Sequence, residues 1–475
     1  MKTPILGSSY VTRSPNAADS RMVNLFPEVV PEGGKEAAWL QRAPGLRLLA
    51  TVGGGPVRGL WTFNGKAYAV SGTGLYQIDD TWAVTYRGNI AGTTQVTMTD
   101  NGTQMFIAAD LYGYVYDSNT NVLTQLTTDF YGAVGCGFLD GWFVYNQPNS
   151  QIFWVLDSTS TTVDPLYFAS AEGSPDNLVT LIVDHREIWL FGENSVEVWY
   201  DAGLPDFPMS RIQGAFNEIG CLAAYSVAKL DNGLFWLGAD ARGNGIVYRS
   251  KGYSGERVST HAVEWQIQQY TTLSDAVGYT YQQDGHSFYV LNFPTANTTW
   301  VYDVATSAWH ERAGWENNAF TRHRGNCQMN FNNEIVIGDY VSGGIYAYDL
   351  TVYTEAGGIQ KWLRSWRALQ TGQNDLNRTA QHSLQLDCQT GVGLDGGVQG
   401  TNPQAMLRWS DDGGHTWSNE HWKSMGKIGQ TGYRTIWRRL GMTLKLRDRV
   451  YEISGTDPVQ IAIMGAELHV SPTNA

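Results

Sequence analysis

The 475-residue sequence contains few cysteines and no long apolar run. Its four cysteines, Cys136, Cys221, Cys327 and Cys388, stand far apart and form no C-x-x-C pair, which argues against a zinc ribbon or a redox dithiol and favours buried free thiols. The first residues lack the apolar core of a signal peptide, and no later run approaches the length of a membrane span. We therefore expect synthesis in a cytoplasm and no membrane segment.

Catalytic and cofactor motifs are also missing. The nine histidines show no H-x-x-x-H spacing, and no G-x-S-x-G elbow is present. The glycines of "GVGLDG" (391–396) are followed by more glycine and a proline where a nucleotide-binding helix would begin. "GGGP" (53–56) lacks the Lys-Ser/Thr of a phosphate loop. We expect no metal, no cofactor and no enzymatic activity.

Positive charge is scarce over most of the chain. The formal net charge is −13, which argues against simple DNA wrapping because phosphate neutralisation needs clustered Lys and Arg. Residues 361–450 nevertheless carry thirteen Lys or Arg against seven acids, a net of +6, which leaves −19 for the rest. This split suggests contacts between an acidic and a basic surface, although an ordinary solvated face explains it as well.

Turn-forming and aromatic residues are abundant, with 53 Gly, 25 Tyr and 18 Trp. Between residues 59 and 350 a unit of two short apolar runs around a turn recurs at steps of 38 to 53 residues. Most units end on an acidic residue, and the ends are Asp79, Asp117, Asp157, Asp201, Ser250, Asp303 and Asp349. Spacing of this kind predicts an all-β chain with a β-propeller of six or seven blades. A tandem of β-sandwiches is the alternative.

The flanks of this repeat have a different composition. Residues 1–55 are rich in proline and glycine and are expected to form an extended N-terminal arm that packs on a neighbour. Residues 56–360 would be the propeller, and residues 361–475, rich in Trp and Arg, a separate platform-like C-terminal β domain. In this last part "MTLKLRDRVYEI" alternates as a half-buried strand would, with Met442, Leu444 and Leu446 on one face and Thr443, Lys445 and Arg447 on the other.

One stretch matches a motif associated with sugar-cleaving enzymes. "SDDGGHTW" (410–417) aligns Ser410, Asp412, Gly414, Thr416 and Trp417 with the Asp-box of sialidases. A Ser and an Asp that bond the backbone of a tight turn, with a glycine at positive φ, explain the pattern mechanically. We interpret the box as a structural turn.

A virion-attached carbohydrate-binding or sialidase-like propeller remains the alternative function. It requires arginines such as Arg58, Arg186, Arg242 and Arg322 to converge at the propeller centre. A sugar groove could be lined by aromatic residues, for which the candidates are Trp189, Trp199, Trp300 and Trp309, but strand alternation favours core packing for them. A free cytoplasmic propeller that acts as an interaction scaffold is a third possibility.

The order of parts resembles the packaged-DNA stabilisation, or tail hub and nozzle, proteins of short-tailed double-stranded DNA phages. The resemblance rests on "RMVNLFPEVVPEGGK", "WLQRAPGLRLLA" and "GGGPVRGL" near the start, on the propeller-like middle, and on the ending from "WSDDGGHTW" to "MGAELHV". It covers nearly the whole chain, although each motif alone is loose.

The resemblance implies a structural virion protein of the phage tail. Copies of the chain, six in this family, would form a ring below the head-to-tail adaptor, and tail fibre, spike or needle proteins would be further partners. Double-stranded DNA would be retained by the ring and later pass through its lumen without sequence-specific binding. We expect Arg364, Arg367, Arg438 and Arg439 to contact neighbouring subunits or the adaptor, with pairing inside the domain as the alternative.

Overall fold

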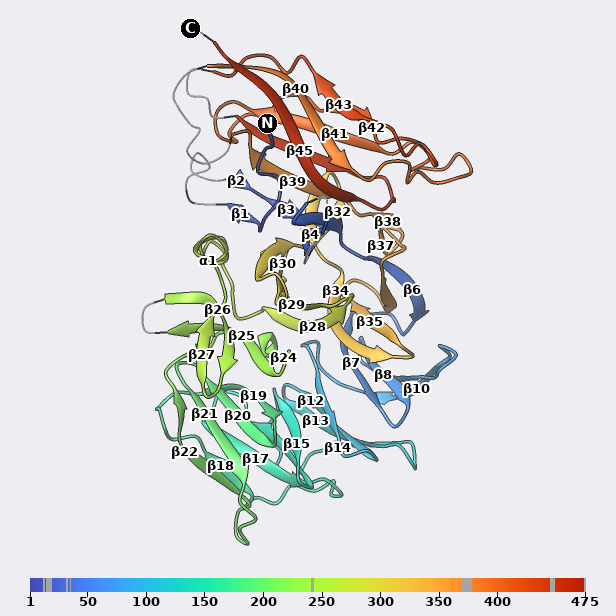
Figure 1. The fold of residues 1–475 in the computed structure, drawn as a ribbon. Helices are drawn as coiled ribbons and strands as arrows, with labels where there is room; N and C mark the ends of the chain where they lie inside the picture. The colour runs from blue at the N-terminus through green and yellow to red at the C-terminus, as the bar shows by residue number, and fades with distance from the viewer. Residues whose placement is uncertain are drawn as a thin grey trace.

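The computed structural model describes residues 1–11, 13, 19–30, 33–34, 36–240, 243–369, 378–444 and 449–473. Within these ranges the only helices are α1 (His261–Gln268) and the short 3-10 turn η1 (Ala224–Ser226). None of the described helices is long and apolar enough to span a membrane. Figure 1 shows two β bodies, a ring of sheets and a sandwich attached to one side of it. The expected all-β class is confirmed.

The ring consists of antiparallel sheets in which most strands pair with their sequence neighbours. The first two contain β7 (Val57–Phe63), β8 (Lys66–Ser71), β9 (Gly74–Ile78) and β10 (Val84–Asn89), then β11 (Thr97–Asp100), β12 (Gln104–Ala109), β13 (Tyr112–Asp117) and β14 (Val122–Leu126). The next two contain β15 (Cys136–Leu139), β16 (Trp142–Asn146), β17 (Ile152–Asp157) and β18 (Phe168–Ser170), then β19 (Leu178–Asp184), β20 (Glu187–Gly192), β21 (Val196–Asp201) and β22 (Met209–Asn217).

Three further sheets complete the ring. They contain β23 (Gly220–Cys221), β24 (Ala228–Leu230), β25 (Gly233–Asp240), β26 (Gly243–Lys251) and β27 (Ser254–Arg257), then β28 (Val277–Gln283), β29 (His286–Phe293), β30 (Thr298–Asp303) and β31 (Ala308–Glu311), and last β34 (Gly325–Phe331), β35 (Glu334–Asp339) and β36 (Gly344–Asp349). The innermost strands contact one another in the order β7, β11, β15, β19, then through η1 to β28, β34 and back to β7. This closed order, with hydrophobic clusters between neighbouring sheets, is that of a β-propeller.

The aspartate that ends most repeats has a common structural role. At Asp79 and Asp157 the side-chain Oδ1 accepts the backbone N–H two residues later, each at 2.9 Å, and so closes the turn into the outer strand. The same bond recurs at the other acidic repeat ends, namely Asp117, Asp201, Asp303 and Asp349. These bonds are Asx turns, which explains why the repeat is visible in the sequence.

The N-terminal segment differs from the arm expected for residues 1–55. Strand β6 (Gly45–Thr51) pairs with β36 and supplies the outer strand of the last propeller sheet, so the propeller begins before residue 56. Strand β4 (Leu25–Val29) pairs with β5 (Ala38–Arg42) inside a sheet of the sandwich. Pro27 is tolerated there because β4 is an edge strand, where one side of the backbone needs no donor. The segment therefore belongs to both bodies.

The sandwich has two sheets, and the N-terminal segment contributes to each. One contains β4, β5, β45 (Ala462–Pro472), β40 (Thr379–Cys388) and β43 (Thr435–Arg438). The other contains β3 (Met22–Val23), β39 (Trp362–Arg367), β44 (Val450–Gly455), β41 (Gln404–Ser410) and β42 (His421–Ser424). Because β3 also pairs with β31, this second sheet continues into the propeller as one nine-stranded sheet.

Three small hairpins complete the described strands. They are β1 (Tyr10–Val11) with β2 (Asp19–Ser20), β32 (Ala313–Glu316) with β33 (Ala319–Arg322), and β37 (Thr354–Glu355) with β38 (Gly358–Ile359).

The burial predicted for the start of "MTLKLRDRVYEI" is wrong. Thr443 is buried and its hydroxyl accepts the N–H of Thr379, whereas Met442 and Leu444 are each more than half exposed. Residues 445–448 lie outside the described ranges. The hydrogen bond between Thr443 and Thr379 therefore decides which face of the segment is buried, against the expectation from its alternating apolar residues.

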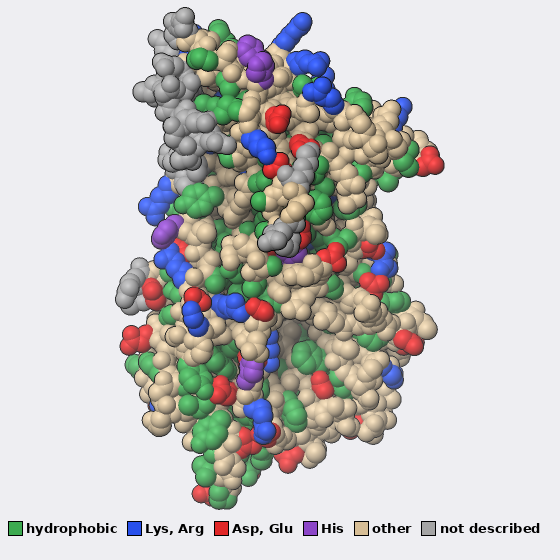
Figure 2. All heavy atoms as spheres, viewed as in Figure 1, with side chains coloured by type: hydrophobic (Ala, Val, Ile, Leu, Met, Phe, Trp, Pro, Cys, Tyr) green, Lys and Arg blue, Asp and Glu red, His purple; other side chains and the backbone are tan. Residues whose placement is uncertain are grey.

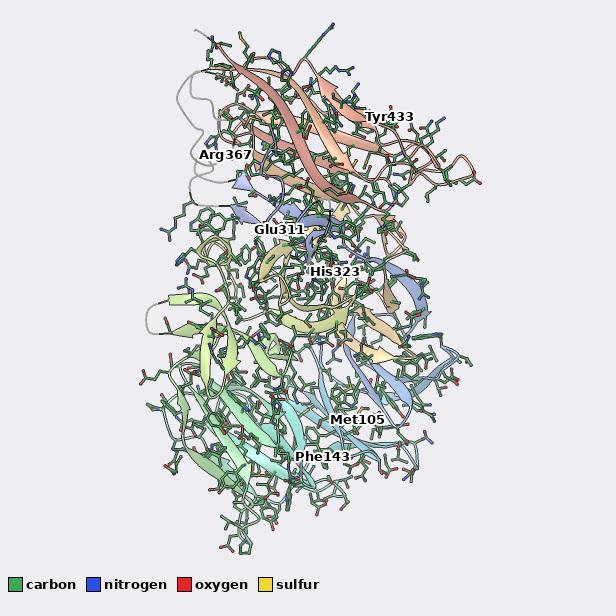
Figure 3. All side chains as sticks on the ribbon, in the orientation of Figure 1. Met105, Phe143, Glu311, His323, Arg367 and Tyr433 are labelled. Atoms are coloured by element: carbon green, nitrogen blue, oxygen red, sulfur yellow. The ribbon has the colours of Figure 1, made fainter. Side chains whose placement is uncertain are left out.

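Two arginine side chains fix the chain where the two bodies meet. The guanidinium of Arg42 is fully buried and donates to the side chain of Gln360 (3.0 Å) and to the backbone carbonyl of Val459 (2.8 Å), among others. Arg21 forms a two-pronged pair with Glu311 at 2.8 Å per contact, and Glu311 lies at the junction in Figure 3. These bonds link the N-terminal segment to residues 290 to 417 positions further along the chain.

We expect Arg42→Ala to lower the free energy of unfolding by about 3–5 kcal/mol, because several buried carbonyl groups lose their donor. Urea unfolding followed by tryptophan fluorescence measures the change. Arg47→Ala is the matched control, since Arg47 is half exposed and pairs with Glu334 and Asp349 at the surface, and it should cost less than about 1 kcal/mol. Equal losses in both variants would contradict the role assigned to Arg42.

Candidate functional site

The innermost propeller strands surround a central cavity of about 860 Å³. Figure 2 shows the ring hollowed at its centre. The wall carries apolar side chains and uncharged polar ones such as Gln95, Thr99 and Asn326. Gln95 and Asn326 bond each other across two sheets, with the Asn326 amide donating to Gln95 Oε1 at 2.9 Å. This bond connects the segment before β11 to β34, the inner strands that lie on either side of β7.

Charged groups of the cavity lie at one rim, on the turns that join inner strands and on β24. The β19–β20 turn places His185 and Arg186 at positive φ, +48° and +64°, where equivalent turns use pairs such as Asp140–Gly141. Arg186 Nη2 donates to both carboxylate oxygens of Asp140, at 2.8 and 2.7 Å. The His185 ring lies between Asp184 and Asn232, and the bond to Asp184 raises its pKa. These contacts join three adjacent sheets.

The arginines required by the sialidase-like alternative do not come together. Arg58 is buried and donates to the backbone carbonyls of its own sheet and of the following loop, and Arg322 stacks 3.5 Å from the ring centre of Tyr340. Of the three described arginines only Arg186 lines the cavity, and Arg242 lies outside the described residues. The tryptophans considered for a sugar groove are all buried, and they are Trp189, Trp199, Trp300 and Trp309.

The Asp-box residues form a hydrogen-bonded turn between β41 and β42 of the sandwich. Ser410 Oγ donates to Asp412 Oδ1 (2.7 Å) and accepts the N–H of Gly414 (2.8 Å), which has φ +95°. The Asp412 carboxylate accepts the N–H and hydroxyl of Thr416, and the Trp417 indole donates to the Gly414 carbonyl at 3.0 Å. These bonds, led by the one from Ser410, lower the pKa of Asp412. None of these residues lines the propeller cavity.

We expect Ser410→Ala to lower the free energy of unfolding by about 1–3 kcal/mol, because the Gly414 amide loses its acceptor. Thermal and urea unfolding measure the effect. Ser254→Ala is the control, since Ser254 lies exposed in a propeller hairpin, and it should change stability by less than about 0.5 kcal/mol. An unchanged Ser410→Ala variant would contradict the structural role of the turn.

Two protein-family models match the chain, one over the propeller and one over the sandwich. The model described as bacteriophage P22 Gp10, β-propeller, matches residues 1–353, and the one described as bacteriophage P22 Gp10, β-sandwich, matches residues 362–471. The chain belongs to the bacteriophage P22 Gp10 family. The family resemblance inferred from sequence is thereby confirmed, and with it a structural protein of the phage tail.

Among solved structures, the Gp10-family chain is similar to virginiamycin B lyase from Staphylococcus aureus, at 11% identity and TM-score 0.41, over 62% of this chain and 94% of the lyase. It is also similar to a chain of the mitotic checkpoint complex, at 11% identity and TM-score 0.44, over 68% and 98% of the two chains. A sensor extracellular domain from B. thetaiotaomicron matches at 12% identity and TM-score 0.44, over 92% and 62%. No curated protein matches the sequence.

The four arginines expected at subunit or adaptor contacts of this Gp10-family chain lie in different environments. Arg364 is fully buried, and its Nε donates to the Ile5 carbonyl at 2.6 Å, so it is not available to another chain. Arg367 is half-buried in the same strand, near Asp19. Arg438 and Arg439 are exposed at the edge of the sandwich. The internal alternative thus holds for Arg364, and the other predictions stay open.

Sequence reasoning missed a buried ion-pair group that fastens strand β4 to the propeller. His286 on β29 contacts Asp303 Oδ2 (2.8 Å) and Glu28 Oε2 (2.6 Å) through its two ring nitrogens. Its hydrogen bond to Asp303, followed by that to Glu28, raises the pKa of His286 to about 9 despite burial. The three residues are 17 to 275 positions apart, so no local pattern could have revealed the group.

The His286 group predicts a pH-dependent stability. Its folded pKa of about 9 lies above the unfolded value of about 6.5, so its contribution is complete below pH ~6.5 and is lost as pH rises through 9. The difference in unfolding free energy between wild type and His286→Gln should fall by about 3 kcal/mol across this window. Urea unfolding at stepped pH measures it, with exposed His415→Gln as control. A difference that is independent of pH would refute the assignment.

Proposed function

We propose that this chain is the hub or nozzle protein of a short phage tail, which joins the head-to-tail adaptor, retains the packaged genome and provides its exit path. The match of the Gp10 family models to both the propeller and the sandwich carries the proposal. By the same resemblance, copies of the chain form a ring, six being the family number, and tail fibre, spike or needle proteins are attached to it.

In this proposal the genome passes between subunits and not through the propeller cavity. A duplex about 20 Å wide that rises about 3.4 Å per base pair occupies on the order of 1,000 Å³ per pair. Inner strands of four to seven residues make a passage through the ring several pairs deep, and the cavity of about 860 Å³ is far too small for that. The DNA path would therefore be formed by the outer surfaces of several copies.

The charge of the chain supports a path along which DNA slides. The net charge is −13, and the part outside residues 361–450 carries −19. An acidic wall repels phosphate and so prevents the tight, salt-dependent binding that clustered Lys and Arg produce.

The decisive test is the DNA content of particles assembled without this chain. Phage carrying a stop codon early in the gene should package DNA into heads and then lose it, because the channel stays open. Nuclease-resistant DNA per capsid measures the loss, and supply of the chain from a plasmid should restore it. Particles that stay full but no longer bind or degrade host polysaccharide would reject the hub and favour the carbohydrate-directed alternative.

A further inference from the structure

The open edge of the sandwich carries an unusual concentration of exposed basic and aromatic side chains. Strands β42 and β43 each end a sheet there and lie side by side, because the Trp437 indole donates to the His421 carbonyl (2.6 Å) and the Thr435 hydroxyl to the Ser424 carbonyl (3.1 Å). The two strands therefore present one continuous surface.

We call this surface, formed by exposed residues of 421–439, the basic band. Three large apolar side chains are solvent-exposed, Trp422 by 57%, Ile428 by 60% and Tyr433 by 43%, and Figure 3 places Tyr433 at this edge. The cations of the band are Lys423, Lys427, Arg434, Arg438 and Arg439. Residues 421–439 include no Asp or Glu, and among the described residues none of the five cations forms an ion pair. The band itself therefore carries charge of one sign only.

A surface of opposite charge lies at the far end of the propeller. Two neighbouring turns, β17–β18 and β21–β22, expose Leu166 by 78% and Leu204 by 53%. Tyr167 and Phe207 from the same turns pack into one hydrophobic cluster, which holds the turns together. Their carboxylates are Asp157, Asp164, Asp201 and Asp206. We call these turns the acidic tip.

The acidic tip and the basic band are complementary in kind. Residues 157–166 and 201–208 contain no Lys or Arg, and none of their four carboxylates forms an ion pair within the described residues. Figure 1 shows β18 and β22 at the end of the ring opposite the sandwich, and Figure 2 shows hydrophobic and acidic side chains together there. The two surfaces therefore cannot meet within one chain.

We propose that the basic band of one copy docks on the acidic tip of a second copy of this chain. The inference rests on the proposed hub function for the expectation of a ring and adds the two surfaces that build it. Unpaired charges of opposite sign steer the encounter, and exposed Trp, Tyr and Arg are the residue types that dominate binding energy at protein interfaces. Aromatic and cationic side chains also serve nucleic-acid binding, but the aliphatic Ile428, Leu166 and Leu204 add nothing to stacking or phosphate contacts and favour a protein partner.

Because two different surfaces meet, the contact is heterologous and repeats from copy to copy. Such contacts generate a closed ring when the rotation between copies closes. A subunit joined in this way uses its whole length, with the sandwich at one contact and the propeller at the other.

The test is the self-association of the purified full-length chain, measured by sedimentation at about 100 μM and low salt. Arg438→Glu/Arg439→Glu should weaken association at least about tenfold, and so should Trp422→Ala. Adding Asp164→Lys/Asp206→Lys to the arginine double variant should restore association. Lys66→Glu, an exposed cation on the propeller, is the control and should leave it unchanged. Thermal unfolding verifies that each variant is folded.

Three results would overturn the proposal: a wild-type chain that stays monomeric under these conditions, folded band variants that associate like wild type, or reversal of the tip charges without rescue. Band variants that associate normally but lose duplex DNA binding would assign the band to nucleic acid. The hub function is tested separately by nuclease-resistant DNA in particles. Particles that retain DNA despite a defective band would reject this interface alone, whereas full particles lacking the chain would reject the hub itself.

Discussion

The architecture depends on two residues, Met22 and Val23, which form a short strand between the propeller and the sandwich. Strand β3 pairs with β31 of the propeller on one side and with β39 of the sandwich on the other, so a single nine-stranded sheet crosses the junction. Fully buried polar groups near it, including the guanidinium of Arg364, find their partners in the first twenty residues. A flexible linker would let the two bodies move independently, whereas this sheet makes them one mechanical unit.

Local sequence signals predicted the repetitive part of the fold well. Most repeats end on an aspartate because its side chain accepts the backbone N–H two residues later and so stabilises the turn. Since both partners lie within three residues, the aspartate recurs at a spacing that the sequence shows directly. The Asp-box residues were recognisable for the same reason, since Ser410, Asp412 and Thr416 bond one another within a single turn.

The parts that sequence could not give are those set by distant partners. The sequence around residues 45–51 contains no signal that predicts the pairing of β6 with a sheet whose other strands begin at residue 325. Arg364 looks like a surface cation in a basic stretch, yet carbonyls of residues 5 and 20 accept its hydrogen bonds and keep it buried. Thr443 is buried in place of its apolar neighbours because its hydroxyl accepts the N–H of Thr379. A sequence shows the charge and the spacing of residues, but not which distant segment will supply a hydrogen-bond or strand partner.

The placement of β6 has a consequence for how the protein is made. Residues 45–51 leave the ribosome among the first, but β36, with which they pair, follows almost 300 residues later. At a synthesis rate of roughly 5–20 residues per second, the strand waits on the order of 15–60 seconds with its backbone unpaired. The intermediate sheets form from local hairpins during this interval, so the ring stays open while they form. It closes only when β6, the first propeller strand to be synthesised, pairs with β36, the last. An interrupted translation product therefore exposes sheet edges at both ends of the arc, which makes truncated chains of this protein prone to pair with one another.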